Sequence, residues 1–576
     1  MSEILNNPQL ESQRKQIVAA KARGVLPTLA VFAKFSGPGW LQSATTLGGG
    51  SLASALYLGV LGGFGFMWLQ PFAMILGIIM LGAISYVTLS VSDRPMNEIN
   101  RQISPILGYG WAIGSMIACF VFAMPQFALG VAAITQNIAT FGEVSKAVEV
   151  AITAVLFAIA MLMVAMYASG GGGVKIFEML IKLSVAAIVI CFFGVVICLT
   201  VGGKIEWSRV WEGFIPNFSV LSVPSEDFME YISLLDKAGR DFWSEMIVSQ
   251  QRSVVISAAA MAVGINMTFL FPYSMLKKGW NKDFRELAIF DLATGLFIPF
   301  LLATSCIVVA SASQFHAKPA EGLAISTVVD GKLSYAVVDG KSVVPAANLV
   351  KPYMALLDER ISSSMGAEKF AALTPAQKDA ARNALSINER NLAAMLVKRD
   401  ASNLSETLVP LVGDSVARYV FGFGVLGMAM NAILMNMLIC GLCFSEIIGK
   451  SGAKWNMLGS SMIVVSAIVS IFFAGARMWL VIYAGVMAMV LLPIAYGAFL
   501  VIMNSGRILK DSKPRGASRV VWNVLMGCSV AASSVASLWV LWNKLGIWGP
   551  LLFAAFLLIV AASYFRLASR RARGAE

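Results

Sequence analysis

The sequence predicts an all-α polytopic membrane protein in which ten helices form two inverted repeats of five and two further helices follow. The 576 residues are 58% hydrophobic and only 13% charged, which is too apolar for a soluble globular protein. Apolar segments of about 20 residues or more, the length that crosses a bilayer, recur along the chain. The first and the sixth of them contain helix-breaking residues, and breaks at corresponding places in two halves are typical of an inverted repeat.

Twelve segments are long and apolar enough to span a membrane. They lie near residues 31–65, 66–92, 107–141, 146–167, 174–201, 250–276, 286–312, 415–447, 455–475, 477–504, 518–542 and 547–567. The predicted organisation is an amino-terminal segment, membrane helices 1–7, an insert, membrane helices 8–12 and a tail, over residues 1–30, 31–312, 313–414, 415–567 and 568–576.

The distribution of Lys and Arg predicts the orientation in the membrane, because short basic connections stay on the cytoplasmic side. Basic residues cluster at the amino terminus, in the links between spans six and seven and between ten and eleven, and after the last span. The alternate loops, such as 204–245, are neutral or acidic. We expect both termini in the cytoplasm and the insert outside a bacterial inner membrane. The net charge of +12 then faces anionic lipid and requires no nucleic-acid partner.

Local signals predict structure within the insert. Asp330-Gly331 and Asp339-Gly340 lie between β-rich runs and predict hairpins. The run from Thr374 to Gln377 has the residues of a helix start, and we expect a helix from there to about Arg399. The single histidine, His316, opens the insert and is expected to be an ordinary surface residue.

The seven cysteines all fall within predicted spans, so free thiols that pack as small apolar residues are expected. Cys440 and Cys443 form a CxxC pair, but the pair lies inside a continuous apolar helix, and a zinc site normally needs four clustered ligands. No resident metal or other cofactor is therefore predicted.

The strongest functional signal is the run Gly48-Gly49-Gly50-Ser51 in the middle of the first span. A glycine inside a helix costs about 1 kcal/mol relative to alanine, so three in succession favour a break that leaves backbone groups without helical partners. At membrane depth such groups persist only where they line a protein cavity. Thr45 and Thr46 precede the break and add hydroxyl groups.

A second interruption is predicted in the sixth span. The stretch from Gly264 to Ser274 is rich in polar groups and carries Pro272 late in the helix, next to Phe271 and Tyr273. Proline removes a backbone donor and clashes with the preceding turn. Taken alone, this stretch also fits a simple proline kink between packed helices. Together with the glycine break five spans earlier, it predicts a binding site between the two repeats.

These residues resemble the Nramp transporters, a family with the leucine-transporter-like fold. The stretch from Gly37-Pro38-Gly39 to Trp68 follows the family's first-helix pattern without a gap. Further similarity occurs at Glu178, Asp291, Leu411-Val412-Gly413 and Phe421-Gly422-Phe423-Gly424. The resemblance covers nearly the whole membrane portion but not the insert. It implies a leucine-transporter-like fold with helices 1 and 6 broken, and secondary transport by alternating access.

The chain departs from the family at the positions where the resemblance implies metal and proton binding. Gly48-Gly49-Gly50-Ser51 replaces Asp-Pro-Gly-Asn, and Phe271-Pro272-Tyr273 replaces Met-Pro-His. Lys278 aligns with the family's second histidine, Leu491 aligns with its tenth-helix glutamine, and span 107–141 contains no Asp or Glu. A divalent cation needs anionic or strongly dipolar ligands. We therefore expect a substrate that is not a divalent metal.

Glycine amides at a helix start, together with uncharged hydroxyls, suit a compact anion such as bicarbonate. The candidate substrate-binding residues are Thr45, Thr46, Gly48, Gly49, Gly50, Ser51, Phe271, Pro272, Tyr273 and Ser274. Candidates for the path or a coupling-ion site are Lys278, Asn431, Asn436 and Leu491. Each Ser or Thr equally fits helix packing, Lys278 fits a cytoplasmic positive residue, and the two asparagines fit interhelical hydrogen bonds.

The sequence thus predicts a transporter, and no ATP-binding loop of the G-x-x-x-x-G-K-[ST] type indicates an enzyme. The expected partners are a small molecule or ion and the lipid bilayer, with a monomer as the plausible state. The coupling ion, Na⁺ or H⁺, stays open. The alternatives are a carrier of hydrated Mg²⁺ or Mn²⁺, a carrier of a neutral or zwitterionic organic solute, and a non-transporting sensor that uses the insert for recognition.

Overall fold

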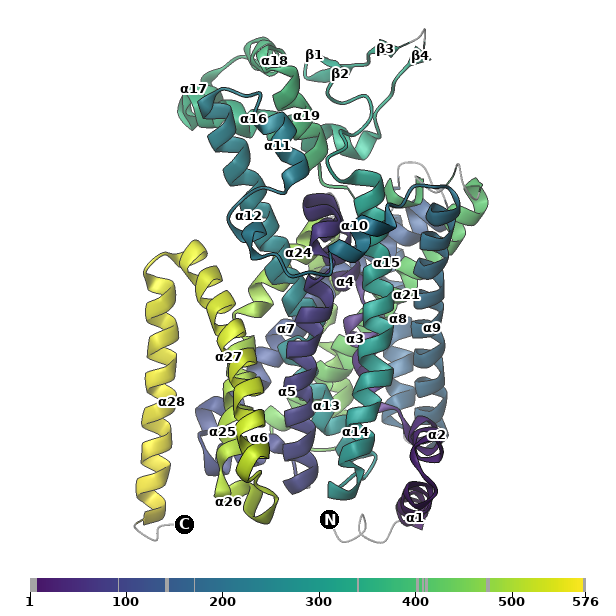
Figure 1. The fold of residues 1–576 in the computed structure, drawn as a ribbon, viewed down its shortest axis with the longest axis vertical. Helices are drawn as coiled ribbons and strands as arrows, with labels where there is room; N and C mark the ends of the chain where they lie inside the picture. Colours follow the sequence, from purple (N-terminus) through teal and green to yellow (C-terminus); the bar gives the residue numbers. More distant parts are fainter. Residues whose placement is uncertain are drawn as a thin grey trace.

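The computed structural model describes residues 8–91, 93–139, 144–169, 171–338, 341–399, 403–406, 409, 413–472 and 477–572. Long helices stand side by side in a bundle, and the segment between α15 and α21 projects from one end of it (Figure 1). The first described helix, α1, and the carboxyl-terminal end of α28 lie at the opposite end. We call these the insert end and the terminal end.

The bounds of the elements follow the chain order. The bundle contains α1 (Pro8–Arg23), α2 (Val25–Phe35), α3 (Pro38–Thr46), α4 (Gly49–Gly62), α5 (Leu69–Val91), α6 (Pro95–Gln102), α7 (Pro105–Ala132), α8 (Lys146–Ala168), α9 (Gly171–Val201), α10 (Trp207–Glu212), α11 (Glu226–Ile232), α12 (Lys237–Ala262), α13 (Ile265–Lys277), α14 (Arg285–Leu292), α15 (Ile298–Phe315), α21 (Asp414–Ile447), α22 (Ala453–Ser461), α23 (Val464–Ser470), α24 (Arg477–Met489), α25 (Leu492–Asn504), α26 (Gly506–Leu509), α27 (Gly516–Leu545) and α28 (Trp548–Ala572). The insert contains β1 (Thr327–Val329), β2 (Lys332–Ser334), β3 (Val337–Val338), β4 (Lys341–Ser342), α16 (Ala347–Met365), α17 (Ala367–Ala372), α18 (Pro375–Ala384) and α19 (Ile387–Leu396).

Eleven helices within the described residues are long and apolar enough to cross a membrane, one fewer than the twelve expected. The difference is the ninth predicted span, 455–475, where the structure has the two short helices α22 and α23. Gly459, Ser460 and Ser461 end α22, and these residue types are weak helix formers. The predicted polytopic helical fold is otherwise confirmed.

Both predicted helix breaks are present. The first lies between α3 and α4, where Gly48 is extended with φ −101° and ψ −178°. The second lies between α12 and α13, where Val263 and Gly264 are both extended. The second break falls at the start of the expected stretch, and Pro272 lies inside the continuous helix α13. Proline inside a membrane helix is tolerated when neighbouring groups satisfy the freed backbone, and so it does not itself mark the break.

The insert is a small folded unit of hairpins and helices. β1 and β2 pair as antiparallel strands across Asp330 and Gly331, both of which have positive φ, so this hairpin is confirmed. The second predicted turn, Asp339-Gly340, lies outside the described residues. Thr374 and Gln377 form the expected capping box, but the helix ends at Ala384 and Ser386 caps the next one.

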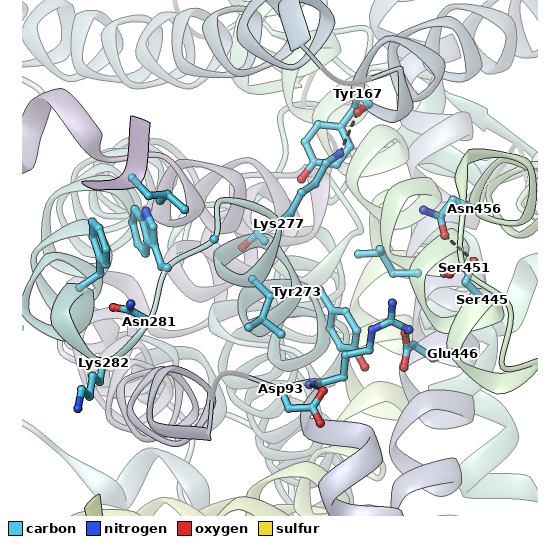
Figure 2. A pocket seen from close by; sticks show the side chains of 18 of the residues that line it. Asp93, Tyr167, Tyr273, Lys277, Asn281, Lys282, Ser445, Glu446, Ser451 and Asn456 are labelled. Carbon is cyan, nitrogen blue, oxygen red and sulfur yellow. Dashed lines mark hydrogen bonds and ion pairs between the residues drawn. The ribbon is translucent and has the colours of Figure 1, made fainter. Parts of the chain in front are cut away.

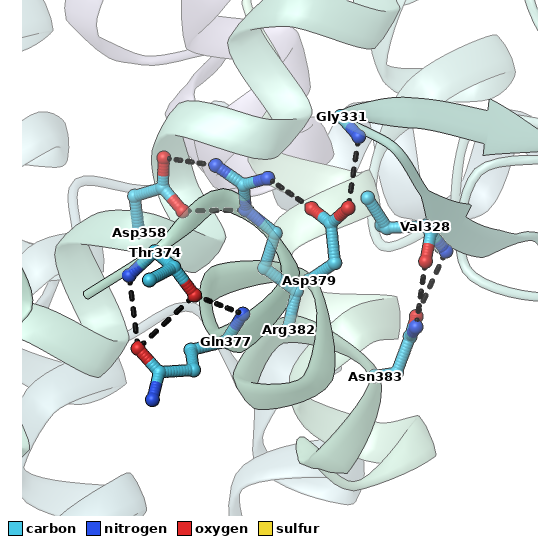
Figure 3. A network of polar contacts seen from close by, with 8 residues as sticks. All are labelled: Val328, Gly331, Asp358, Thr374, Gln377, Asp379, Arg382 and Asn383. Carbon is cyan, nitrogen blue, oxygen red and sulfur yellow. Dashed lines mark hydrogen bonds and ion pairs between the residues drawn. The ribbon is translucent and has the colours of Figure 1, made fainter.

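Arg382 joins three parts of the insert (Figure 3). Its guanidinium contacts Asp358 of α16 at 2.6 Å and Asp379 of α18 at 2.8 Å. Asp379 also accepts a hydrogen bond from the Gly331 amide in the hairpin, at 2.8 Å. The two carboxylates raise the pKa of Arg382 above its ordinary value, against the effect of burial.

Arg399 and Tyr57 are among the residues that fasten the insert to the bundle. The Arg399 guanidinium donates to the carbonyls of Phe315, at 2.9 Å, and Lys318, at 2.7 Å. Tyr57 of α4 donates its hydroxyl to the Arg399 carbonyl at 2.8 Å. His316, which was expected on the surface, is instead buried at this junction because the loop carrying α10 and α11 covers it.

Candidate functional site

A small cavity of about 30 Å³ lies where the two helix breaks meet. It is large enough for a water molecule or a comparably small ion. The lining comes from α3, α4, α7, α12, α13 and α21. Its residues are Thr45, Thr46, Gly48, Gly50, Phe122, Gln126, Ala260, Met261, Gly264, Asn266, Met267, Ala432 and Asn436. None of these residues carries a formal charge.

Gln126 of α7 faces the first break. Its Oε1 accepts a hydrogen bond from the Gly49 amide at 2.9 Å. A backbone N–H can only donate, so this contact fixes the orientation of the side-chain amide. The Nε2 group has no hydrogen-bond acceptor among the described residues, and it is the part of this side chain that remains available to a ligand.

A relay of amides joins the second break to α21. The Met267 amide donates to Asn266 Oδ1 at 3.0 Å, Asn266 Nδ2 donates to Asn436 Oδ1 at 3.0 Å, and Asn436 Nδ2 donates to the Ala432 carbonyl at 2.8 Å. Because a backbone donor begins the relay and a backbone carbonyl ends it, both side-chain orientations are determined. Each asparagine oxygen is thus an acceptor, and each NH₂ group retains a second N–H.

The predicted hydroxyls hold the breaks in place. Thr46 donates to the carbonyls of Met261, at 2.8 Å, and Ala262, at 2.6 Å, and so links the first break to the second. Ser51 donates to the Thr46 carbonyl across the first break. Thr45 donates to the Leu41 carbonyl at 2.9 Å within its own helix. Their oxygens remain possible acceptors, but their protons are directed to the backbone.

The glycines of the first break are packed too closely for any side chain. A Cβ at Gly48 would lie 2.6 Å from the Ala432 Cβ, and one at Gly49 would lie 2.2 Å from Leu129 Cδ2. At Gly50 it would lie 2.4 Å from the sulfur of Met261. Glycine here lets α4 approach three neighbouring helices and brings its first amides to the cavity.

The four candidates late in the sixth span do not line this cavity. Phe271 and Pro272 are buried in the helix bundle. Tyr273 and Ser274 line a second, larger hollow of about 770 Å³ toward the terminal end. We call it the vestibule.

Two helices that line the cavity also line the vestibule, whose lining side chains are shown in Figure 2. On α13, Met267 lines the cavity and Tyr273 lines the vestibule, about 9 Å further along at 1.5 Å per residue. On α21, Asn436 lines the cavity and Glu446 lines the vestibule. Glu446 is paired with Arg94 at 2.9 Å.

The remaining candidates have separate positions. Lys278 pairs with Glu178 at 3.2 Å, and its amine lies against Gly37 at the start of α3. Asn431 is buried on α21 but does not line the cavity, and its Nδ2 has no described partner. Leu491 lies at the bend between α24 and α25 and packs against the core. Asn436 is therefore the only member of this group of four that lines the cavity.

Asp291 secures the start of α3. Its carboxylate accepts from the Gly37 amide at 3.1 Å, from the Gly39 amide at 2.7 Å and from the Ser36 hydroxyl. Lys182 donates to the Ser36 carbonyl at 3.0 Å. A carboxylate at a helix start satisfies amides that have no partner within the helix. These contacts position the half-helix that leads to the cavity.

Sequence reasoning missed Gln126, Asn266 and the two methionines, Met261 and Met267. The signal for Gln126 was a long polar side chain in the apolar middle of the third span. Asn266 belongs to the polar stretch that the sequence indicated, six residues before Pro272.

Comparison with known proteins agrees with this architecture. The family model for Nramp, described as natural resistance-associated macrophage protein-like, matches residues 388–543. A histidine-to-alanine variant of the Eremococcus coleocola manganese transporter is similar in structure, with TM-score 0.59, 10% identity, and coverage of 94% of this chain and 96% of that chain. The same transporter in complex with an aromatic bis-isothiourea substituted compound gives TM-score 0.58, 10% identity, and coverage of 95% of each chain. No curated protein matches the sequence.

The broken helices and the cavity between them define the class: a polytopic membrane protein with the architecture of a secondary transporter. Within that class, the chain is similar to the Nramp family over residues 388–543, in agreement with its sequence resemblance, and it shares the fold of the solved manganese transporter.

Proposed function

We propose that this protein is a secondary transporter that moves a small non-metal solute, an inorganic anion such as bicarbonate, by alternating access. The observation that supports the proposal is the central cavity, which has no charged lining residue and whose amide side chains retain N–H donors.

The three amide side chains line one small volume. Gln126 Nε2 is free of protein acceptors in the described part of the chain, and Asn436 keeps one N–H beyond the one used in the relay, whereas the Asn266 side chain also contacts the thiol of Cys119. The half-helices α4 and α13 both begin at the cavity, and a helix start carries partial positive charge. Hydrogen bonds to an anion are about twice as strong as neutral ones, so uncharged donors suffice for a compact anion.

A divalent metal is the second candidate. The relationship to the Nramp family favours it, and the thioethers of Met261 and Met267 line the cavity. A metal would nevertheless have to bind there without a carboxylate or imidazole in the cavity lining. The three amide oxygens already accept hydrogen bonds, which weakens them as replacements.

The vestibule lies between the cavity and the terminal end, and it is the proposed route for release there. We infer that this end is cytoplasmic, because the predicted basic clusters lie in segments at that end. Buried residues separate the two hollows, between Met267 and Tyr273 on α13 and between Asn436 and Glu446 on α21. These residues must move before a solute can be released at the terminal end. We leave the coupling ion, Na⁺ or H⁺, undefined.

The test is flux into proteoliposomes. Vesicles containing a pH-sensitive dye are challenged with bicarbonate, and parallel vesicles containing metal-sensitive dyes are challenged with Mn²⁺ or Mg²⁺. Protein-free liposomes correct for CO₂ permeation. We expect a protein-dependent bicarbonate signal without metal uptake. Metal uptake without a bicarbonate response would reject the anion proposal.

Gln126→Glu distinguishes the two candidates at the site itself. Glutamate still accepts from the Gly49 amide, but it lacks the NH₂ donor and adds negative charge. We expect at least a tenfold loss of anion flux, whereas a cation carrier would retain or gain flux. Asn543→Asp is the matched control, because Asn543 is exposed and remote from the cavity and should leave flux unchanged.

A further inference from the structure

A second polar junction lies at the insert end and is centred on the only histidine of the chain, His316, which follows α15. The residue is 9% exposed. Its Nδ1 lies 2.9 Å from the carbonyl oxygen of Val60 in α4. A carbonyl can only accept, so Nδ1 must carry a hydrogen, and Nε2 is the atom that gains or loses a proton.

Nε2 faces two groups of different character. Ser225 Oγ lies 3.3 Å away and the Oδ2 atom of Asp227 lies 3.1 Å away. A neutral ring accepts from the Ser225 hydroxyl, whereas a protonated ring donates to the Asp227 carboxylate. The ring stands edge-on to Phe228, with 5.3 Å between centroids, and a Cβ at Gly63 would lie 2.5 Å from it. These contacts leave the imidazole one orientation.

The charged groups around the ring come from four segments. Arg209 of α10 donates to the same Asp227 oxygen at 2.8 Å. The other charged side chains that line the same pocket, of about 390 Å³, are all exposed; they are Lys204, Glu206, Glu226, Glu230 and Lys318. Water can therefore deliver protons to the junction. Hydrogen bonds from His316 and then Arg209 hold the pKa of Asp227 well below its usual range, so its carboxylate is ionised at physiological pH.

We propose that His316 is a proton-binding site through which the pH on the insert side controls the attachment of half-helix α4. The same ring contacts Val60, near the end of α4, and Asp227 of α11. Half-helix α4 begins at the central cavity, and the His316 ring holds its other end through the Val60 carbonyl. Protonation exchanges a neutral hydrogen bond for an ion pair and ties α11 more tightly to α4 and α15.

The first experiment observes the imidazole directly. Full-length protein without a polyhistidine tag, labelled with ¹⁵N-histidine, gives one imidazole to follow by NMR from about pH 4.5 to 8.5, the range in which histidine titrates. We expect the neutral imidazole to carry its hydrogen on Nδ1, and we expect the ring signals to change in a single titration step. Asp227→Asn should shift that step to lower pH, because the carboxylate that stabilises the charged ring is gone. A ring whose signals do not change, or whose neutral form is protonated at Nε2, would overturn the proposal.

The second experiment measures the attachment of α4. Amide hydrogen exchange of α4 and α11 is compared between wild type and His316→Gln at the same pH. At about pH 5.5 we expect exchange to be about fivefold slower in the wild type, because a charge-assisted hydrogen bond is stronger than a neutral one. Above the midpoint of the titration step observed by NMR, most of this difference should be lost, because the ring has then lost its charge.

Ser225→Ala is the matched control, since it removes the neutral-state partner only and should keep the slow exchange at low pH. Equal exchange in wild type and His316→Gln at both pH values would reject the attachment. Neither experiment uses a transport substrate, so both outcomes are independent of whether the anion proposal is correct.

Discussion

At the residue scale, the glycine run decides the geometry of the cavity. Gly49 carries the amide that orients Gln126, and the surrounding atoms leave no room for a side chain. The sequence predicted the break from these glycines alone because backbone freedom is a local property. It could not predict Gln126, which lies 77 positions away and meets the break only in the folded bundle.

Gly49→Ala should disturb both stability and transport. The added Cβ would lie 2.2 Å from Leu129 and 2.5 Å from Gln126 Oε1, so the glutamine must move. We expect a loss of about 1–3 kcal/mol, typical of overpacking, and at least tenfold lower flux. Thermal unfolding in detergent and proteoliposome flux measure the two effects.

Gly497→Ala is the appropriate control for that variant. A Cβ at this helical position in α25 has nothing within 4 Å. The higher helix propensity of alanine should leave stability unchanged or raise it by up to about 1 kcal/mol. If both variants behaved alike, close packing at Gly49 would not be important.

At the element scale, a proline in the sequence does not locate the second helix break. Pro272 lies inside the unbroken helix α13, whereas the extended residues that form the break are Val263 and Gly264. A Cβ at Gly264 would lie 2.6 Å from Asn266 Oδ1, and the amide relay occupies the space next to it. The packing around the break therefore involves Phe122 of α7 as well as the neighbouring turns, and local propensity does not reveal that contact.

The relay between α13 and α21 predicts energetic coupling. Asn266→Ala and Asn436→Ala each remove one side of the 3.0 Å contact. In a double-mutant cycle we expect the two changes to be non-additive by about 0.5–1.5 kcal/mol, the range of interhelical hydrogen bonds in membranes. Thermal unfolding of the four proteins gives the value. Additive effects would mean that the contact does not link the helices.

At the scale of the whole molecule, the membrane bundle was largely predictable and the insert was not. Composition and span length determine most of the helices because lipid leaves the backbone few alternatives. In the insert, the Asp330-Gly331 turn and the Thr374 cap were readable as local signals. Its attachment through Arg399 and Tyr57 joins residues 342 positions apart and has no local signature.

The predicted orientation of the protein in the membrane can be tested by labelling cysteines from one side. Lys369 is exposed on the insert and Glu11 is exposed near the amino terminus. In intact cells, a membrane-impermeant thiol reagent should label Lys369→Cys at once and Glu11→Cys only after permeabilisation. The unmodified protein, with its seven native cysteines, sets the background. The opposite labelling pattern would place the vestibule outside.

The amide relay between α13 and α21 also has a kinetic consequence. For α13 to separate from α21 beside Asn266 and Asn436, at least one of its hydrogen bonds must break. If the substrate is an anion, as proposed above, the bound anion accepts the released N–H directly, whereas an empty carrier replaces that bond only with a water molecule that enters. The loaded carrier should therefore reorient faster than the empty one, and exchange of solute across the membrane should outpace net uptake.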